Sequence, residues 1–162
     1  MRRTSARVLT TIAAIIAVLA TTLGPASAAP PTRVDFTISE SLAVTTGTLT
    51  AGSLPGCSGA VTVTTSPVTV STSGPFTEFA GTKTITCTEA GGVSGTMTIE
   101  FDAKVRLEPF CDGANKGSWS VLGGTGVYAS ATGGGKLNGT YPGGDSCLAG
   151  AVDDRYTGRI RI

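Results

Sequence analysis

Residues 96–108 read "TMTIEFDAKVRLE", and the two-residue alternation of this stretch decides the fold class. Its apolar side chains fall on one parity, namely Met97, Ile99, Phe101, Ala103, Val105 and Leu107. Its polar side chains fall on the other, namely Thr96, Thr98, Glu100, Asp102, Lys104, Arg106 and Glu108. Successive side chains of a strand point to opposite faces. The pattern therefore predicts one long strand with a buried face and a charged outer face, ended by Pro109.

The same alternation recurs along most of the chain after residue 32. Further predicted strands lie in "RVDFTI" (33–38), "LAVTTGTLT" (42–50), "AVTVTT" (60–65), "VTVST" (68–72), "PFTEFAGTKTITC" (75–87), "GSWSVL" (117–122) and "DRYTGRIRI" (154–162). Short Gly- and Pro-rich turn signals separate these runs, and this spacing is typical of a sandwich or a barrel. A last strand that pairs near the first would remove exposed sheet edges. We therefore expect an all-β, antiparallel β-barrel of about eight strands, with a β-sandwich as the alternative.

The first 28 residues have the pattern of a signal peptide. A basic start with three arginines precedes an uncharged apolar core of about 17 residues, and Ala26-Ser27-Ala28 forms an A-x-A cleavage site. A retained transmembrane anchor is the alternative, but no basic stop-transfer cluster follows. We expect cleavage before Ala29, so that residues 29–162 form a single secreted domain that is extracellular and free of the membrane.

Charge argues against nucleic acid as a partner. Removal of Arg2, Arg3 and Arg7 with the signal peptide leaves nine basic residues against eleven acidic ones, a net charge of −2. Nucleic-acid-binding domains carry a basic patch or stripe, and none is visible in the sequence. The oligomeric state does not follow from the sequence.

Four cysteines remain in the predicted mature chain, at positions 57, 87, 111 and 147. An even number in an exported protein favours disulfides. A zinc site would want close pairs such as C-x-x-C, and the chain has neither such a pair nor any histidine. We expect no metal, and of the three possible pairings we favour Cys57–Cys87 with Cys111–Cys147, since each joins neighbours in the chain.

A glycine-rich segment at residues 123–141 reads "GGTGVYASATGGGKLNGTY". Gly124, Gly126 and Ala129 fit the dinucleotide-binding pattern G-x-G-x-x-A, but that motif needs a helix immediately after it. Three consecutive glycines follow instead, and each costs about 1 kcal/mol in a helix relative to alanine. We therefore expect no cofactor, and we predict a hairpin with "GGTG" as the tight turn and "VYASAT" as the returning strand. Asn138-Gly139 is a second turn signal.

The segment also carries a resemblance to known proteins. Residues 117–141 followed by "DRYTGRI" resemble a motif of small secreted actinobacterial proteins of unassigned function. The core "GGTGVYASATG" (123–133) resembles the GGTG-aromatic-x-x-A-x-G signature of the allene oxide cyclase and dirigent barrel superfamily, with Tyr128 at the aromatic position, Ala131 at the alanine and Gly133 at the last glycine. The resemblance covers about 40 residues. It implies an eight-stranded barrel with a central cavity. Members of the superfamily handle small hydrophobic molecules, but the residues that line their pockets have no match in this sequence.

The sequence offers few candidate residues for catalysis or ligand binding. The absence of histidine excludes Ser-His-Asp and Cys-His arrangements. Glu100 and Asp102 share one strand face and are weak candidates for an acid and a base, although a solvated outer face is the plainer interpretation. Asp153-Asp154, expected just before the last strand, offer oxygen ligands of the kind that calcium prefers, although two adjacent aspartates at a turn usually have no such specific role. Trp119, Tyr128 and Tyr141 are candidate ligand-binding residues, with core packing as the alternative.

These observations favour a binding role over catalysis. We expect a secreted, disulfide-stabilised barrel that binds a small apolar or aromatic molecule, or a surface glycan. One alternative is an enzyme similar to allene oxide cyclase or to dirigent proteins, with a carboxylate or tyrosine in its pocket. A second alternative is an extracellular interaction protein or inhibitor that uses its loops. A buried carboxylate facing a cavity would favour the enzyme.

Overall fold

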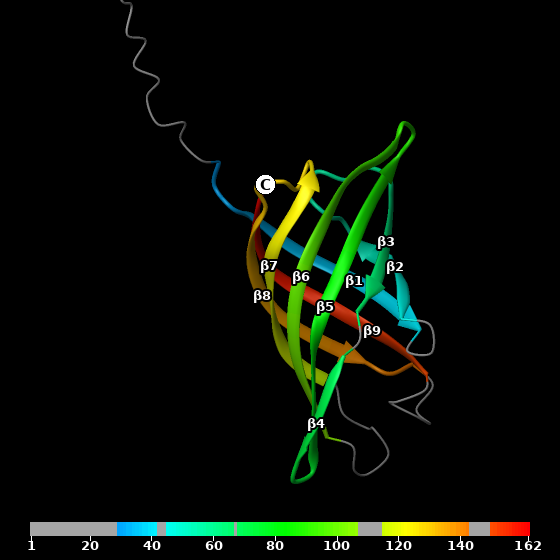
Figure 1. Cartoon of the computed structure of the whole chain (residues 1–162), viewed down its shortest axis with the longest axis vertical. Helices are drawn as coiled ribbons and strands as arrows, with labels where there is room; N and C mark the ends of the chain where they lie inside the picture. Colours follow the sequence, from blue (N-terminus) through cyan, green and yellow to red (C-terminus); the bar gives the residue numbers. More distant parts are fainter. Residues whose placement is uncertain (1–28, 42–44, 67, 107–114, 143–149) are drawn as a thin grey trace, which may run out of the picture.

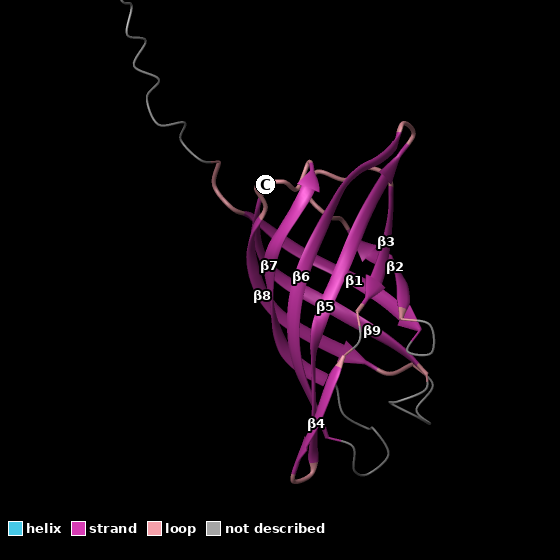
Figure 2. Ribbon diagram, in the orientation of Figure 1, coloured by secondary structure: helices cyan, strands magenta, loops and turns pink. Residues whose placement is uncertain are grey.

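The computed structural model describes residues 29–41, 45–66, 68–106, 115–142 and 150–162. In these residues the chain forms nine strands and no helix (Figures 1 and 2). The strands are β1 (Thr32–Ser41), β2 (Thr46–Gly52), β3 (Ala60–Thr65), β4 (Thr69–Ser73), β5 (Phe76–Glu89), β6 (Gly92–Arg106), β7 (Asn115–Gly126), β8 (Thr132–Thr140) and β9 (Ala151–Arg161).

Eight of these strands close into an antiparallel barrel, which confirms the predicted fold class over the sandwich. Around the barrel the order is β1, β2, β3, β5, β6, β7, β8 and β9, and β9 returns to pair with β1. The last strand therefore pairs with the first, as predicted, from Thr32 opposite Ile160 to Ser41 opposite Ala151. The ninth strand, β4, is an extra one that pairs with the first part of β5, beyond the point where β3 ends (Figure 1).

The core fills the interior according to the alternation in the sequence. In β6 the side chains of Met97, Ile99 and Phe101 are buried, while those of Glu100 and Asp102 are exposed. The predicted faces of residues 96–106 are thus confirmed, and Leu107, Glu108 and Pro109 lie outside the described residues.

Three aromatic side chains form a layer across the middle of the interior. The rings of Phe36 and Tyr156 stack with centroids 5.1 Å apart. Trp119 meets both edge-on, at 6.3 Å from Phe36 and 6.0 Å from Tyr156. Pairs of this geometry stabilise a core beyond the area they bury, so this part of the barrel is packed and not hollow.

The glycine-rich segment differs from its prediction in where the turn lies. Residues 123–126 ("GGTG") are the end of β7, and the turn consists of residues 127–130. Gly126 has φ = +56°, and a Cβ there would lie 2.1 Å from the carbonyl oxygen of Ser94. Only glycine at this position allows both a left-handed backbone and the close approach of β6. Asn138-Gly139 lies inside β8 and makes no turn.

One disulfide joins Cys57, in the loop before β3, to Cys87, which is fully buried in β5. It confirms half of the predicted pairing. Cys111 and Cys147 lie outside the described residues. A disulfide is typical of oxidising compartments, and among the described residues no helix is long and apolar enough to cross a membrane.

Candidate functional site: a cavity at one end of the barrel

A cavity of about 280 Å³ lies at the end of the barrel where β1, β3 and β8 finish and β7 and β9 begin. Most of the surface area of this cavity is apolar, and its lining residues come from every strand except β2 and from adjoining loops. The apolar residues of the lining are Val68, Val70, Phe79, Phe101, Ala103, Leu137 and Val152. The described polar residues at the same cavity are Glu40, Ser41, Thr45, Thr65, Lys83, Asn115, Tyr141 and Asp154.

A buried ion-pair cluster forms the inner side of this cavity. Nζ of Lys83 lies 2.7 Å from Oε1 of Glu40 and 2.7 Å from Oδ2 of Asp154. The side chain of Lys83 is only 2% exposed, and those of Glu40 and Asp154 are 4% and 5% exposed. The same Nζ lies 4.8 Å from the centre of the Phe101 ring and 5.6 Å from that of Tyr156. We call Glu40, Lys83 and Asp154 the charged cluster.

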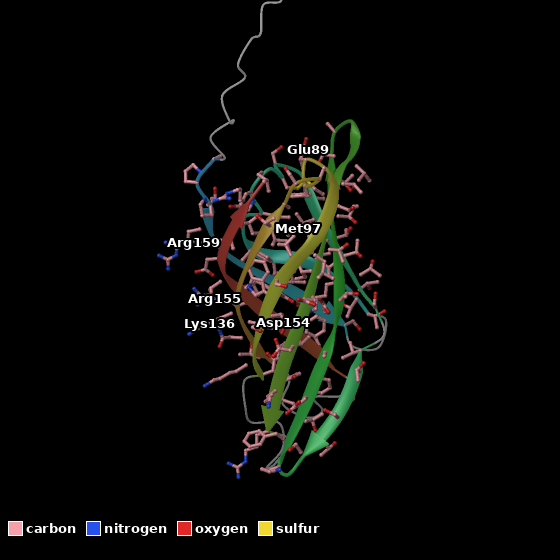
Figure 3. The ribbon with its side chains drawn as sticks, turned by 60° about the vertical axis from the view of Figure 1, so that its left-hand side comes forward. Glu89, Met97, Lys136, Asp154, Arg155 and Arg159 are labelled. Carbon is pink, nitrogen blue, oxygen red and sulfur yellow. A yellow bond between two sulfur atoms is a disulfide. The ribbon has the colours of Figure 1, made fainter. Side chains whose placement is uncertain are left out.

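Strand parity brings the three charges inside. Glu40 follows Val34, Phe36 and Ile38 on the buried face of β1, while Asp154 lies between buried Val152 and Tyr156 in β9. Figure 3 shows Asp154 within the barrel and its neighbour Arg155 projecting from the outside. Ile38 pairs with Asp154 across β1 and β9, which places Glu40 two residues further along the same interface. Lys83 reaches them from β5, a strand that does not adjoin β1 or β9.

Neutral polar groups hold the carboxylates of the charged cluster in place. The hydroxyl of Thr65 donates to Oε2 of Glu40 at 2.9 Å. Nδ2 of Asn115 donates to Oδ1 of Asp154 and to the hydroxyl oxygen of Tyr141, both at 3.3 Å. Hydrogen bonds to a charged partner are worth roughly 1.5–3 kcal/mol, so these contacts fix the positions of both carboxylates.

Gly139 makes room for this arrangement. A Cβ at this position in β8 would lie 2.3 Å from Oδ1 of Asn115 and 2.3 Å from Oδ1 of Asp154. Real Cβ atoms do not approach that closely, so any larger residue would push the carboxamide or the carboxylate out of place. The turn signal Asn138-Gly139 therefore marks a close approach to the charged cluster.

The surroundings keep Lys83 charged and the nearby tyrosines neutral. Burial lowers the pKa of Lys83, but the facing oxygens of Tyr156, Asp154 and Glu40 outweigh it and raise the pKa well above its usual value. Burial also raises the pKa of Tyr156 and of Tyr141. At neutral pH the cluster therefore presents an ammonium group between two acidic side chains.

Only one of the three predicted aromatic residues lines the cavity. Tyr141 does so, with its hydroxyl accepting from Asn115. Trp119 is 3% exposed in the aromatic layer, where its indole N–H donates to the carbonyl oxygen of Thr157 at 3.4 Å. Tyr128 is fully buried in the turn after β7, at the opposite end of the barrel, and burial raises the pKa of its phenol to about 12.

The predicted carboxylate pair faces away from the cavity. Glu100 and Asp102 lie on the outer face of β6, where Glu100 accepts from the hydroxyl of Ser120 at 2.6 Å and Asp102 accepts from that of Ser118. The residues Asp153-Asp154 lie within β9 and not before it: Asp153 accepts from Ser39, and Asp154 belongs to the charged cluster. Among the described residues no group of three or more acidic or cysteine side chains is placed to hold a metal ion.

Sequence reasoning missed the charged cluster, although a signal for it exists. Glu40, Lys83 and Asp154 each occupy an inward parity in a strand whose other inward residues are mostly apolar. Charged residues are almost never fully buried unless they are paired. One lysine and two carboxylates on the apolar faces of three strands therefore indicate a buried ion-pair network, provided that the faces are assigned first.

The cavity offers two kinds of contact. Burial of its apolar side chains against an apolar group is favourable, because it removes apolar surface from water. The charged cluster and Asn115 supply directional polar contacts at one side. Comparisons with protein-family models, with curated proteins and with solved structures give no match to this chain. The function of the chain is therefore inferred from its fold and its cavity.

Proposed function

We propose that the chain is a binding protein for a small, largely apolar molecule that occupies the cavity at the end of the barrel. One observation carries the proposal: a cavity of about 280 Å³ has predominantly apolar walls and a few polar groups that converge at one side. Sites for small molecules have this composition, and their volumes begin near roughly 300 Å³. The position of Tyr141 in the lining also supports the proposal.

The proposal includes export of the protein. The signal-peptide pattern of residues 1–28 supports it, and so does the Cys57–Cys87 disulfide. We also propose a relationship to the allene oxide cyclase and dirigent superfamily. It is supported by the sequence of residues 123–133 and by the antiparallel barrel fold. A surface glycan is the less favoured ligand, because the expected platform, Trp119, is almost fully buried.

Binding of a neutral fluorescent probe tests this function. N-phenyl-1-naphthylamine becomes brighter in an apolar site, and we expect one saturable site in the wild-type protein. Ala103→Phe places a ring in the cavity, since Ala103 is buried and part of the lining, and we expect it to abolish the signal. Ala80→Phe is the matched control, because Ala80 is exposed on β5. No saturable signal in the wild type, or equal signals in both variants, would contradict the proposed function.

An enzyme remains the second candidate, because a specific observation favours it. The carboxylates of Glu40 and Asp154 are buried beside the cavity, together with the phenol of Tyr141. Acid–base catalysis uses such groups within hydrogen-bond reach of a substrate. Recovery of a bound ligand with its structure unchanged would favour the binding protein, whereas its conversion at a rate that Tyr141→Phe reduces would favour the enzyme.

A further inference from the structure

The cavity is lined by more acidic than basic side chains. Its described lining contains one basic residue, Lys83, and two acidic ones, Glu40 and Asp154. With all three ionised the sum is −1. An unpaired buried charge is strongly unfavourable, so this site favours a ligand that brings a positive charge.

The positive charge of Lys83 is enclosed by its own neighbours. Two carboxylate oxygens lie 2.7 Å from Nζ, and the ring of Phe101 lies 4.8 Å away. An anionic ligand would have to displace one of these carboxylates from Lys83. The geometry therefore gives an anion no free positively charged partner among the described residues of the cavity.

Two oxygen atoms at the cavity have unused capacity to accept hydrogen bonds. Oδ1 of Asn115 is buried and receives no hydrogen bond from the described residues, and the whole residue is only 6% exposed. Oε1 of Glu40 faces Nζ of Lys83 at 2.7 Å and, as a carboxylate oxygen, can accept a second hydrogen bond. Buried polar atoms normally have a partner, so these two acceptors point to a ligand that donates hydrogen bonds.

We propose that the ligand is a primary amine, bound as its ammonium ion, with a small apolar body. This inference rests on the proposed function and names the chemical class of its ligand. The ammonium group lies at the charged cluster, where it offsets the excess negative charge and donates to Asn115 and Glu40. The apolar body contacts the walls, whose rings of Phe79 and Phe101 also favour a nearby cation.

Three probes that share a phenylethyl body and differ in their polar group test the inference by calorimetric titration at neutral pH. They are 2-phenylethylamine, 2-phenylethanol and 3-phenylpropanoate. We expect the amine to bind about tenfold more tightly than the alcohol, because a charge-assisted hydrogen bond is roughly twice as strong as a neutral one. We expect the carboxylate to bind most weakly. Equal affinities, or tighter binding of the carboxylate, would overturn the inference.

Glu40→Gln provides the matched variant, since it keeps the shape of the side chain and makes the cluster neutral. We expect it to remove the preference for the amine over the alcohol, while Glu100→Gln on the outer face keeps it. A preference unchanged in Glu40→Gln would overturn the role of the cluster. If all three probes fail to bind while N-phenyl-1-naphthylamine still binds, the amine inference fails and the proposed function stands. If the naphthylamine also fails to bind, both fail.

Discussion

At the scale of single residues, Lys83 is the buried cation that joins two carboxylates from different strands. It is the only described basic group in the cavity lining, and it lies between two buried carboxylates. Removing one partner of a buried ion pair leaves an uncompensated charge, whereas replacing the whole network by apolar groups is often neutral. The charged cluster therefore behaves as a unit.

Lys83→Met is expected to lower the free energy of unfolding by about 3–5 kcal/mol, because Glu40 and Asp154 lose their shared cation. The triple variant Glu40→Leu, Lys83→Met, Asp154→Leu is expected to lose less, since it leaves no buried charge. Urea unfolding measures both values. Lys104→Met, which breaks the exposed pair with Glu78, is the control with little effect. A triple variant less stable than Lys83→Met would contradict this account.

Alkaline pH provides a second test of the same residue. The pKa of Lys83 and that of Tyr156 are raised in the folded protein, so the folded state holds protons that the unfolded chain releases above about pH 10. Stability is therefore complete below that pH and decreases as the pH rises further, by about 1.4 kcal/mol per pH unit for each group. Urea unfolding between pH 9 and 11.5 measures the slope, and a slope in Lys83→Met as steep as in the wild type would refute the assignment.

At the scale of elements, alternation predicted the strands well where one face is charged. Residues 96–106 in β6 and 154–161 in β9 took their predicted form because a one-residue slip would bury charges and expose the core. The glycine-rich segment lacks that constraint. Its turn lies at residues 127–130 and not at residues 123–126, where a Cβ at Gly124 or Gly126 would collide with the backbone of β6.

Closure of the barrel between β3 and β5 is reinforced by the Cys57–Cys87 disulfide. Val61 pairs with Cys87 in the register, and the bridge spans 30 residues of sequence. The double variant Cys57→Ser, Cys87→Ala is expected to lose about 3–4 kcal/mol of stability from the larger entropy of the unfolded chain. Thermal and urea unfolding measure this loss. A double variant as stable as the wild type would show that the strand pairing alone closes the barrel.

At the scale of the whole molecule, the barrel is packed through its middle and has a cavity at one end. The aromatic layer of Phe36, Trp119 and Tyr156 fills the middle, and the cavity begins beside it at the charged cluster. The sequence singles out the carboxylates of Glu100 and Asp102, which lie on the outer face of β6. The carboxylates at the cavity, those of Glu40 and Asp154, come together because β9 closes onto β1, a long-range contact that local patterns do not contain.

The location of binding tests the central claim most directly. Titration of the isotope-labelled protein with 2-phenylethylamine and with N-phenyl-1-naphthylamine, followed by backbone amide NMR shifts, shows where each molecule lies. The account predicts shifts concentrated at Ala103, Leu137 and Val152 around the cavity, with Met97 and Tyr128 at the far end unchanged. Shifts centred on the outer face of β6 or on the Tyr128 end, with the cavity residues unmoved, would contradict it.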